Sequence, residues 1–216
     1  MLRSVLWVLA CCARAGQVGL VKIWAFLMDL TSKLLIAMPG MSDPRFDKSV
    51  VFLCAHSASE GAMGLVINHM SSDISFVDLL KQVKVSFGKD LASSPGLLGV
   101  HIGGPVEHTR GFVLHSRDYA GSGAALCIDD RFAMTATIDI LEDIALGRGP
   151  SQALLALGYA GWGPGQLESE ILANAWLTAD ATAQLVFETP GAGKWEAALS
   201  TLGVDPVSLS SAAGRA

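Results

Sequence analysis

The stretch ALLALGYAGWGPGQLESEILANAW, residues 153–176, constrains the fold more than any other part of the sequence. Residues 153–159 form a continuous apolar run, and the glycines that follow favour a central strand over a buried helical turn. From Gln166, apolar residues recur at helical spacing up to position 177. Glu168 and Glu170 occupy the first turn of this segment, where carboxylates interact favourably with the helix dipole. The stretch therefore predicts a buried strand, a glycine-rich turn and a helix over residues 166–177.

Short apolar segments elsewhere predict the remaining elements. Strands are expected at residues 34–38, 49–55, 64–68, 100–102, 111–115, 125–128, 132–135 and 184–187, and helices at residues 76–83, 138–145 and 194–202. Several connections between strands are too short for the crossovers that parallel strands need. We therefore expect an α+β fold with a largely antiparallel, strongly bent sheet.

The first 27 residues differ from the rest of the chain in charge and hydropathy. They contain three basic residues and no acidic one, and polar residues interrupt their apolar runs before any run reaches the roughly 18–20 residues of a membrane helix. A signal peptide, a lipoprotein signal ending at Cys11 and an upstream start codon are three interpretations of this segment. We favour the third. The expected organisation is a non-native or unstructured extension over residues 1–27, a single domain over residues 28–205, and a disordered tail over residues 206–216.

Charge and cysteine content indicate which classes of partner to expect. The chain has 15 basic and 20 acidic residues, and residues 28–216 alone carry a net charge of −8. Nonspecific affinity for nucleic acids comes from Lys and Arg, so we do not expect direct nucleic-acid binding, nor membrane association. Cys54 and Cys127 lie far apart in apolar runs, which predicts two buried, reduced thiols and a cytoplasmic location.

The strong motifs of catalysis and metal binding are missing from the sequence. The run PGAGK at residues 190–194 is close to a phosphate-binding loop. That pattern, however, requires Gly where Glu188 stands and Ser or Thr where Trp195 stands, so the run is interpreted as a turn before a helix. The five histidines show none of the usual ligand spacings. We predict no metal site and no cofactor.

Two loops have residue patterns suited to an anion. Residues 38–47 form a polar loop between apolar strands, in which Arg45 pairs with an acidic neighbour or faces a ligand. In residues 103–112, Gly103 and Gly104 allow backbone amides to approach an anion, and Arg110 supplies a charged fork. The simpler interpretation of this second loop is a tight connection in which Arg110 holds an acidic neighbour.

The loop at residues 158–170 suits a different kind of partner. Its glycines leave a helix N-terminus accessible beside Trp162, and Gln166 and Glu168 can face a ligand. The acidic side chains favour a cation, an amine or a polypeptide there. The simpler interpretation is that these carboxylates only stabilise the helix.

Taken in order, these segments resemble the YqgE/AlgH family of bacterial proteins. The resemblance runs from Met28 to about residue 205 and rests on MDLT at 28–31, LLIAMP at 34–39, GAMG at 61–64, GGPV at 103–106, RGFVLH at 110–115, GYAGW at 158–162, GQLE at 165–168 and NAW at 174–176. It implies a cytosolic protein whose bent sheets form a pseudo-barrel flanked by helices. It implies no agreed reaction, although some members are described as transcriptional regulators.

The sequence thus predicts a binding or regulatory protein that engages a small anionic ligand or a protein partner. One alternative is a small-molecule hydrolase in which His115 or Glu168 acts as a base. Another is a structural or assembly module with Trp162 and Trp176 at an interface. The candidate ligand-binding residues are Arg45, Gly103, Gly104, Arg110, His115, Trp162, Gln166 and Glu168.

Overall fold

The structure is a computed structural model that describes residues 29–85, 87, 98–119, 121, 125–206 and 209. The expectations for residues 1–27 and for most of the tail after Pro206 lie outside the described residues. The strands are β1 (Lys33–Ala37), β2 (Val50–Ser57), β3 (Gly61–Val66), β4 (Val100–Ile102), β5 (Val106–Ser116), β6 (Leu126–Cys127), β7 (Phe132–Thr135), β8 (Ala153–Trp162) and β9 (Trp176–Asp180). The helices are η1 (Pro44–Phe46), α3 (Phe76–Gln82), α4 (Ile138–Ala145), α5 (Gln166–Leu172), η3 (Gln184–Glu188) and α6 (Gly191–Thr201).

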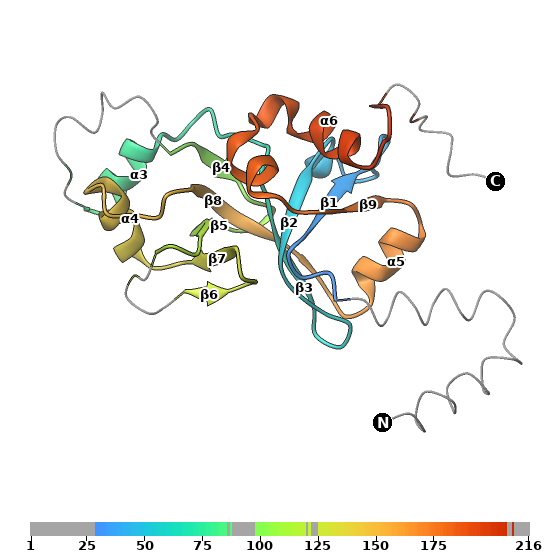
Figure 1. Ribbon diagram of the computed structural model, residues 1–216, viewed down its shortest axis with the longest axis horizontal. Coiled ribbons are helices and arrows are strands. Elements are labelled where there is room, and N and C mark those ends of the chain that lie inside the picture. Colours follow the sequence, from blue (N-terminus) through green and yellow to red (C-terminus); the bar gives the residue numbers. More distant parts are fainter. Residues whose placement is uncertain are drawn as a thin grey trace, which may run out of the picture.

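The described strands form one curled sheet in the order β6-β7-β5-β8-β3-β2-β1-β9, with β4 added beside β8 (Figure 1). Every pair is antiparallel except β4 with β8. Strand β8 joins the two parts of the sheet, because its first half pairs with β5 and its second half with β3. Register shifts in β2 against β3 and in β5 against β8 bend the strands, as bulges do. The prediction of a bent, largely antiparallel sheet is confirmed, and the sheet curls into a half-barrel.

Both faces of the sheet are covered, which explains the continuous apolar runs in the sequence. In β1, Leu34 and Ile36 face the core under η3 and α6, whereas Leu35 and Ala37 face a second core under α5. A third core lies where α3 and α4 pack on the part of the sheet formed by β5 and β8. Because neighbouring residues of a strand point to opposite faces, a strand buried on both sides shows no polar alternation.

The predicted helix over residues 166–177 is wrong at its C-terminal end. Helix α5 stops at Leu172, and Asn174 has a left-handed φ of 57° that ends the helical path. The chain then enters β9, whose Trp176 pairs with Ala37 of β1. Trp176 and Leu177 fit the helical period, but pairing with β1 decides their conformation, which local periodicity does not report.

Two further predictions need correction. Residues 184–187 form the π-helix η3 instead of a strand, and it buries Leu185 and Val186 in the core. Thr182 begins this turn, because its Oγ1 accepts the Leu185 N–H and its carbonyl accepts the Val186 N–H. Cys127 is exposed in the short edge strand β6 instead of buried, while Cys54 is buried as predicted.

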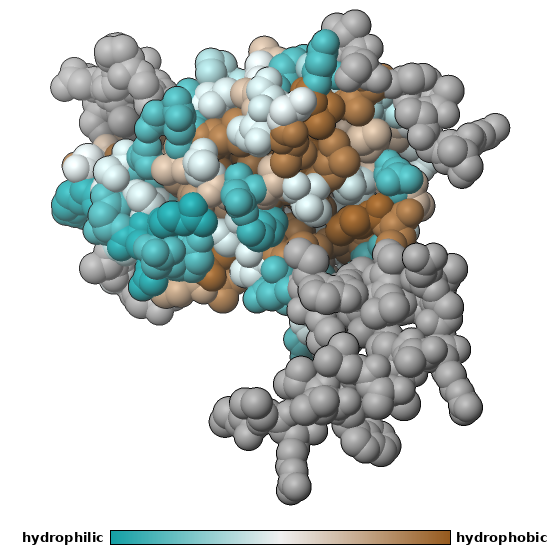
Figure 2. All heavy atoms as spheres, turned by 45° about the vertical axis from the view of Figure 1, so that its right-hand side comes forward, coloured by the Kyte–Doolittle hydropathy of each residue, from teal (hydrophilic) through white to brown (hydrophobic). Residues whose placement is uncertain are grey.

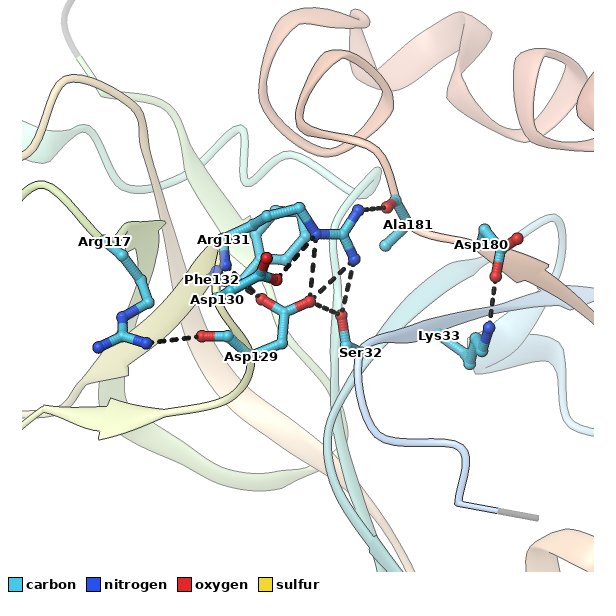
Figure 3. Close-up of polar contacts among 9 residues, drawn as sticks. All are labelled: Ser32, Lys33, Arg117, Asp129, Asp130, Arg131, Phe132, Asp180 and Ala181. Carbon is cyan, nitrogen blue, oxygen red and sulfur yellow. Dashed lines mark hydrogen bonds and ion pairs between the residues drawn. The ribbon is translucent and has the colours of Figure 1, made fainter.

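A polar clamp ties the β6–β7 turn to the other part of the sheet (Figure 3). The Asp129 carboxylate accepts hydrogen bonds from Ser32 Oγ at 2.6 Å and from Arg131 Nη2 at 2.8 Å, and Arg131 Nη1 donates to the Ala181 carbonyl at 2.7 Å. Burial alone raises the pKa of Asp129, but the hydrogen bonds from Ser32, Arg131 and the Phe132 N–H outweigh it and lower that pKa to about 2. The clamp holds the curl of the sheet by joining residues about 100 positions apart in sequence.

Candidate functional site

The predicted loop at residues 158–170 forms a closed polar cluster on the α5 side of the sheet. Glu170 Oε2 accepts the indole N–H groups of Trp162 at 2.9 Å and Trp176 at 2.8 Å, and its Oε1 accepts from Gln166 Nε2 at 2.8 Å. Gln166 Oε1 in turn accepts the Gly163 N–H. Trp162, which is buried, and Gln166, which is exposed, are thus both engaged with groups of the protein itself, where they hold α5 against β8 and β9.

The loop at residues 38–47 packs on this cluster. Phe46 lies against both indoles, with ring centroids 6.5 Å from Trp162 and 5.5 Å from Trp176. The neighbouring Arg45 is exposed and forms a bidentate ion pair with Asp43, with Nη2 to Oδ2 at 2.6 Å. The structure therefore brings two of the three predicted loops together, and it supports the structural interpretation of Arg45.

Glu168 has a partner that the sequence did not indicate. His56 Nε2 lies 3.0 Å from Glu168 Oε1, and both side chains are almost completely buried. His56 Nδ1 accepts the Leu30 N–H at 3.2 Å, so the ring proton sits on Nε2 and points to the carboxylate. This pair connects α5 to the chain that enters β1.

His115 does not meet Glu168. It is fully buried in β5, where Nδ1 donates to the Ser116 carbonyl at 2.8 Å and Nε2 lies 3.0 Å from Thr135 Oγ1. Burial lowers the pKa of His115. Since His115 and Glu168 are each held by other groups, the structure does not support a catalytic unit built from this pair.

Gly103 and Gly104 allow a close approach between strands. A Cβ on Gly103 would lie 2.3 Å from the Gly158 carbonyl oxygen, and one on Gly104, at φ 153°, would lie 2.2 Å from the Tyr159 carbonyl carbon. The Gly103 N–H already donates to Leu157 O at 2.7 Å. These glycines therefore serve the packing of β4 against β8.

Arg110 also has a structural explanation. Its Nη1 donates to Glu107 Oε2 at 3.1 Å, and its guanidinium lies 5.1 Å from the centre of the Phe112 ring. Both groups of this ion pair are about half exposed, so the pair adds little to stability. The interpretation in which Arg110 holds an acidic neighbour is confirmed.

The assembly alternative placed two tryptophans at an interface, but both are internal. Trp162 is 7% exposed and Trp176 is 2% exposed. Figure 2 shows apolar surface on the side that faces right in Figure 1, where α5, β9 and α6 lie. Exposed leucines in this region include Leu172 in α5 and Leu202 directly after α6. The tryptophans therefore stabilise the fold instead of forming a contact surface.

A cavity of about 360 Å³ lies beside the start of α6, and none of the predicted residues lines it. We call it the Lys194 hollow. Lys194 is 2% exposed, and its Nζ donates to the Val186 carbonyl at 2.6 Å. Within the described part of the chain, no carboxylate lies within ion-pair distance of this ammonium group. Burial lowers the pKa of Lys194 to about 8, so the group is still mainly charged near pH 7.

His101 lines the same hollow. It is 9% exposed, and its Nδ1 has no hydrogen-bond partner among the described residues. Burial and the charge of nearby Lys194 lower the pKa of His101, and they outweigh hydrogen bonding to the backbone of Leu155 and Gly99, which raises it. The ring is therefore neutral near pH 7, and a buried nitrogen without a partner is uncommon enough in native proteins to require an explanation.

Packing of α6 fixes the geometry of the Lys194 hollow. Trp195 Nε1 donates to the Ala37 carbonyl at 2.9 Å, which anchors the helix to the end of β1. Gly191 approaches the Asn68 backbone so closely that a Cβ there would lie 2.7 Å from the Asn68 carbonyl oxygen. A second hollow of about 390 Å³ adjoins the first, and the two share Leu98, Ala153, Phe187 and Glu188. Together they form a groove along the start of β8.

Comparison with known proteins identifies the family. The sequence profile described as AlgH-like matches residues 34–207. The chain belongs to the AlgH-like family. A UPF0301 protein of Cereibacter sphaeroides is 54% identical over 192 residues, which is 88% of this chain and all of that protein. A UPF0301 protein of Jannaschia is 59% identical over 189 residues, covering 87% of this chain and 96% of the relative.

Solved structures agree with the AlgH-like assignment. The solution structure of the AlgH protein from Pseudomonas aeruginosa is 39% identical and superposes with a TM-score of 0.71, covering 88% of this chain and 97% of that one. A crystal structure of a Corynebacterium diphtheriae protein, 24% identical with a TM-score of 0.63 over 80% of this chain and 86% of that one, shares the fold. The half-barrel implied by the family resemblance is thereby confirmed.

Two further features are absent from the part of the chain that the structure describes. No group of three or more His, Cys, Asp or Glu side chains in this part of the chain is placed to hold a metal ion. None of its helices is long and apolar enough to cross a membrane.

Sequence reasoning missed His56 and the Lys194 hollow for different reasons. His56 gave no signal, because its partner Glu168 lies 112 positions away. The hollow did give one, since Lys194 ends the PGAGK run that was interpreted as a turn. A lysine at a glycine-rich helix start is a usable sign of an anion site. Its neighbour His101, however, comes from a distant strand, so the sequence did not show that the two residues lie together.

Proposed function

We propose that this AlgH-like protein binds a small anionic ligand in the Lys194 hollow and acts as a cytoplasmic regulatory protein. The observation that carries the proposal is the buried Lys194, which lines a cavity and whose ammonium group has no carboxylate partner among the described residues. Burying an unpaired cation is costly, so such groups are normally paired. A ligand that brings the missing negative charge relieves this cost.

The size and lining of the hollow favour a small molecule. About 360 Å³ lies within the range of small-ligand pockets, and Phe187 and Leu98 supply apolar walls beside the charged end. The net charge of −8 over residues 28–216 argues that any regulatory action proceeds through the ligand or a protein partner and not through direct contact with nucleic acid.

A thermal-shift experiment on the full chain tests the proposal. Succinate is compared with its neutral analogue succinamide at pH 7, alongside citrate and phosphate, in the native protein, in Lys194→Met and in Lys81→Met. Lys81 is an exposed lysine of α3 and serves as the matched control. Anions are expected to raise the melting temperature of the native and Lys81→Met proteins and to leave Lys194→Met unchanged.

The proposal fails if none of the anions stabilises the native protein. It also fails if Lys194→Met responds as strongly as Lys81→Met, because binding would then occur elsewhere. Methionine retains most of the length and apolar packing of the lysine stem, and circular dichroism checks that the variant folds.

A further inference from the structure

The start of α6 faces the Lys194 hollow without a cap of its own. The helix is 11 residues long, its N-cap residue Pro190 makes no side-chain cap hydrogen bond, and its first turn holds no acidic residue. The first amide groups of a helix lack partners within the helix and carry a partial positive charge. Pro190 and Gly191, at this helix start, line the hollow. The amide end of α6 is thus open toward the same space as Lys194.

His101 gives an independent indication at the same place. It comes from β4, far from α6 in sequence, and its buried Nδ1 has no partner among the described residues. An anion beside this nitrogen favours the form of the ring that carries a proton there. Residues that carry three kinds of donor therefore line one cavity: Pro190 and Gly191 at the start of α6, Lys194, and His101.

We infer that the anion held in the Lys194 hollow is a phosphate group, and that the ligand is a phosphomonoester whose body carries hydroxyl or amino groups. This inference rests on the proposed function, because it names the ligand class of the same hollow. The helix start and Lys194 belong to α6 and His101 belongs to β4, so the donors come from two elements of the fold. A tetrahedral phosphate with three terminal oxygens accepts from several directions, whereas a planar carboxylate offers only two oxygens.

The part of the hollow that Glu188 lines indicates the chemistry of the rest of the ligand. Glu188 lines both hollows, and its Oε1 accepts from Gln152 Nε2 at 2.9 Å. A carboxylate repels a phosphate and accepts hydrogen bonds from hydroxyl or amino groups. The phosphate therefore belongs at the Lys194 end, and the polar body of the ligand extends past Glu188 into the second hollow of about 390 Å³.

The PGAGK run thus contributes to phosphate binding without being a complete phosphate loop. In that motif a glycine-rich turn wraps the phosphate and a Ser or Thr follows the lysine. Here Gly191 lies close against the Asn68 backbone, and Trp195 follows the lysine and anchors the helix to β1. The helix start and the lysine remain, and His101 supplies the third donor.

Calorimetry on the full chain with matched ligands tests this inference. Glucose 6-phosphate, glucuronate and glucose share one ring and differ in the group at carbon 6, and inorganic phosphate is the minimal probe. Glucose 6-phosphate is expected to bind at least about tenfold more tightly than glucuronate, and glucose is not expected to bind. Lys194→Met should weaken both phosphates by about tenfold or more, Lys194→Arg by less, and Lys81→Met not at all.

The outcomes separate this inference from the proposed function. If glucuronate binds as tightly as glucose 6-phosphate and both need Lys194, the anion site stands and the phosphate assignment is overturned. If neither phosphate binds at about 20 mM while succinate or citrate still stabilises the protein through Lys194, the phosphate assignment again fails alone. If no anion binds in either experiment, both proposals fall.

Nuclear magnetic resonance distinguishes a ligand-binding role of Lys194 from a purely structural one, because it reports whether phosphate changes the surroundings of His101. Inorganic phosphate should shift the His101 imidazole resonances of the native protein and leave those of the buried His115 in place. Shifts that survive in Lys194→Met, or that are absent in the native protein, contradict the arrangement. Glu188→Gln should weaken glucose 6-phosphate severalfold without weakening inorganic phosphate, and an equal loss for both would remove Glu188 from the ligand contact.

Discussion

The charged groups of the polar cluster under α5 and those of the Lys194 hollow beside α6 are satisfied differently. Under α5, Glu170 accepts two indole N–H groups and an amide, and Glu168 is paired with His56. Beside α6, the Lys194 ammonium group donates to the Val186 carbonyl alone among the described residues, and the His101 Nδ1 has no hydrogen-bond partner there. A closed polar network stabilises a fold, whereas unsatisfied groups around a cavity indicate a place for a ligand.

This difference shows that a conspicuous sequence pattern can mark a region of packing. Glycines, tryptophans and glutamates are concentrated in residues 158–170. Their donors and acceptors form hydrogen bonds with one another, so the pattern reflects a tightly packed region of the fold. The hollow is built from less conspicuous residues. It is recognised by two buried groups that lack a partner among the described residues: Lys194 has no carboxylate, and the His101 Nδ1 has no hydrogen bond. Four measurements test this contrast.

The largest expected effect is a change of stability with pH that depends on Lys194. Its pKa is about 8 in the folded protein and 10.5 ordinarily, so between these values the unfolded chain holds a proton that the folded protein has released. Raising the pH through this interval therefore favours folding, by up to about 3 kcal/mol. Urea unfolding of the native protein should show this rise relative to Lys194→Met. Parallel pH profiles would mean that the ammonium group is not desolvated.

Removing Glu170, at the centre of the closed cluster, should change the free energy of unfolding by nearly as much. Glu170→Ala leaves the buried indole N–H groups of Trp162 and Trp176 unpaired, which is expected to lower the free energy of unfolding by about 2–3 kcal/mol. Glu142→Ala, at an exposed position of α4, is the control. Anion binding should be unchanged in both variants. A loss of binding in a folded Glu170→Ala protein would place the ligand site under α5 and reverse the comparison.

Breaking the His56–Glu168 pair should have a smaller effect. His56→Leu fills the space but leaves a buried carboxylate without its donor, at a cost of about 2 kcal/mol. Glu168→Gln keeps an acceptor for His56 and should cost less. Chemical denaturation of both variants gives the order. If the two variants lose equal stability, the charge of Glu168 contributes as much as its hydrogen bond with His56.

The smallest effect is expected at Gly193, in the first turn of α6. A Cβ at this position meets no atom within 4 Å, so Gly193→Ala should stabilise the helix by about 0.5 kcal/mol. Anion binding should persist. Gly104→Ala should have the opposite effect and destabilise the protein, because its Cβ would overlap the Tyr159 backbone and prevent normal packing. If Gly193→Ala abolishes binding without unfolding the protein, the ligand occupies the space beside that glycine.

Much of the fold was predictable because its elements are coded by short-range patterns. Residues 34–37 and 50–54 are buried on both faces and give unbroken apolar runs, and Ser75 caps α3 as predicted by accepting the Asp78 N–H. The errors occur where long-range contacts outweigh local preference. Residues 176 and 177 fit a helix but pair with β1, and residues 184–187 fit a strand but turn as η3 to fill the core.

The candidate site was less predictable than the fold. The sequence by itself determined the family, the apolar strands and the ion pairs between near neighbours, such as Arg45 with Asp43 and Arg110 with Glu107, because these depend on residues close together in the chain. Only the tertiary structure decided which polar groups are paired within the protein and which belong to residues that line a cavity. It joined His56 to Glu168 and placed His101 beside Lys194, since burial and the presence or absence of a partner are properties of elements brought together from distant parts of the chain.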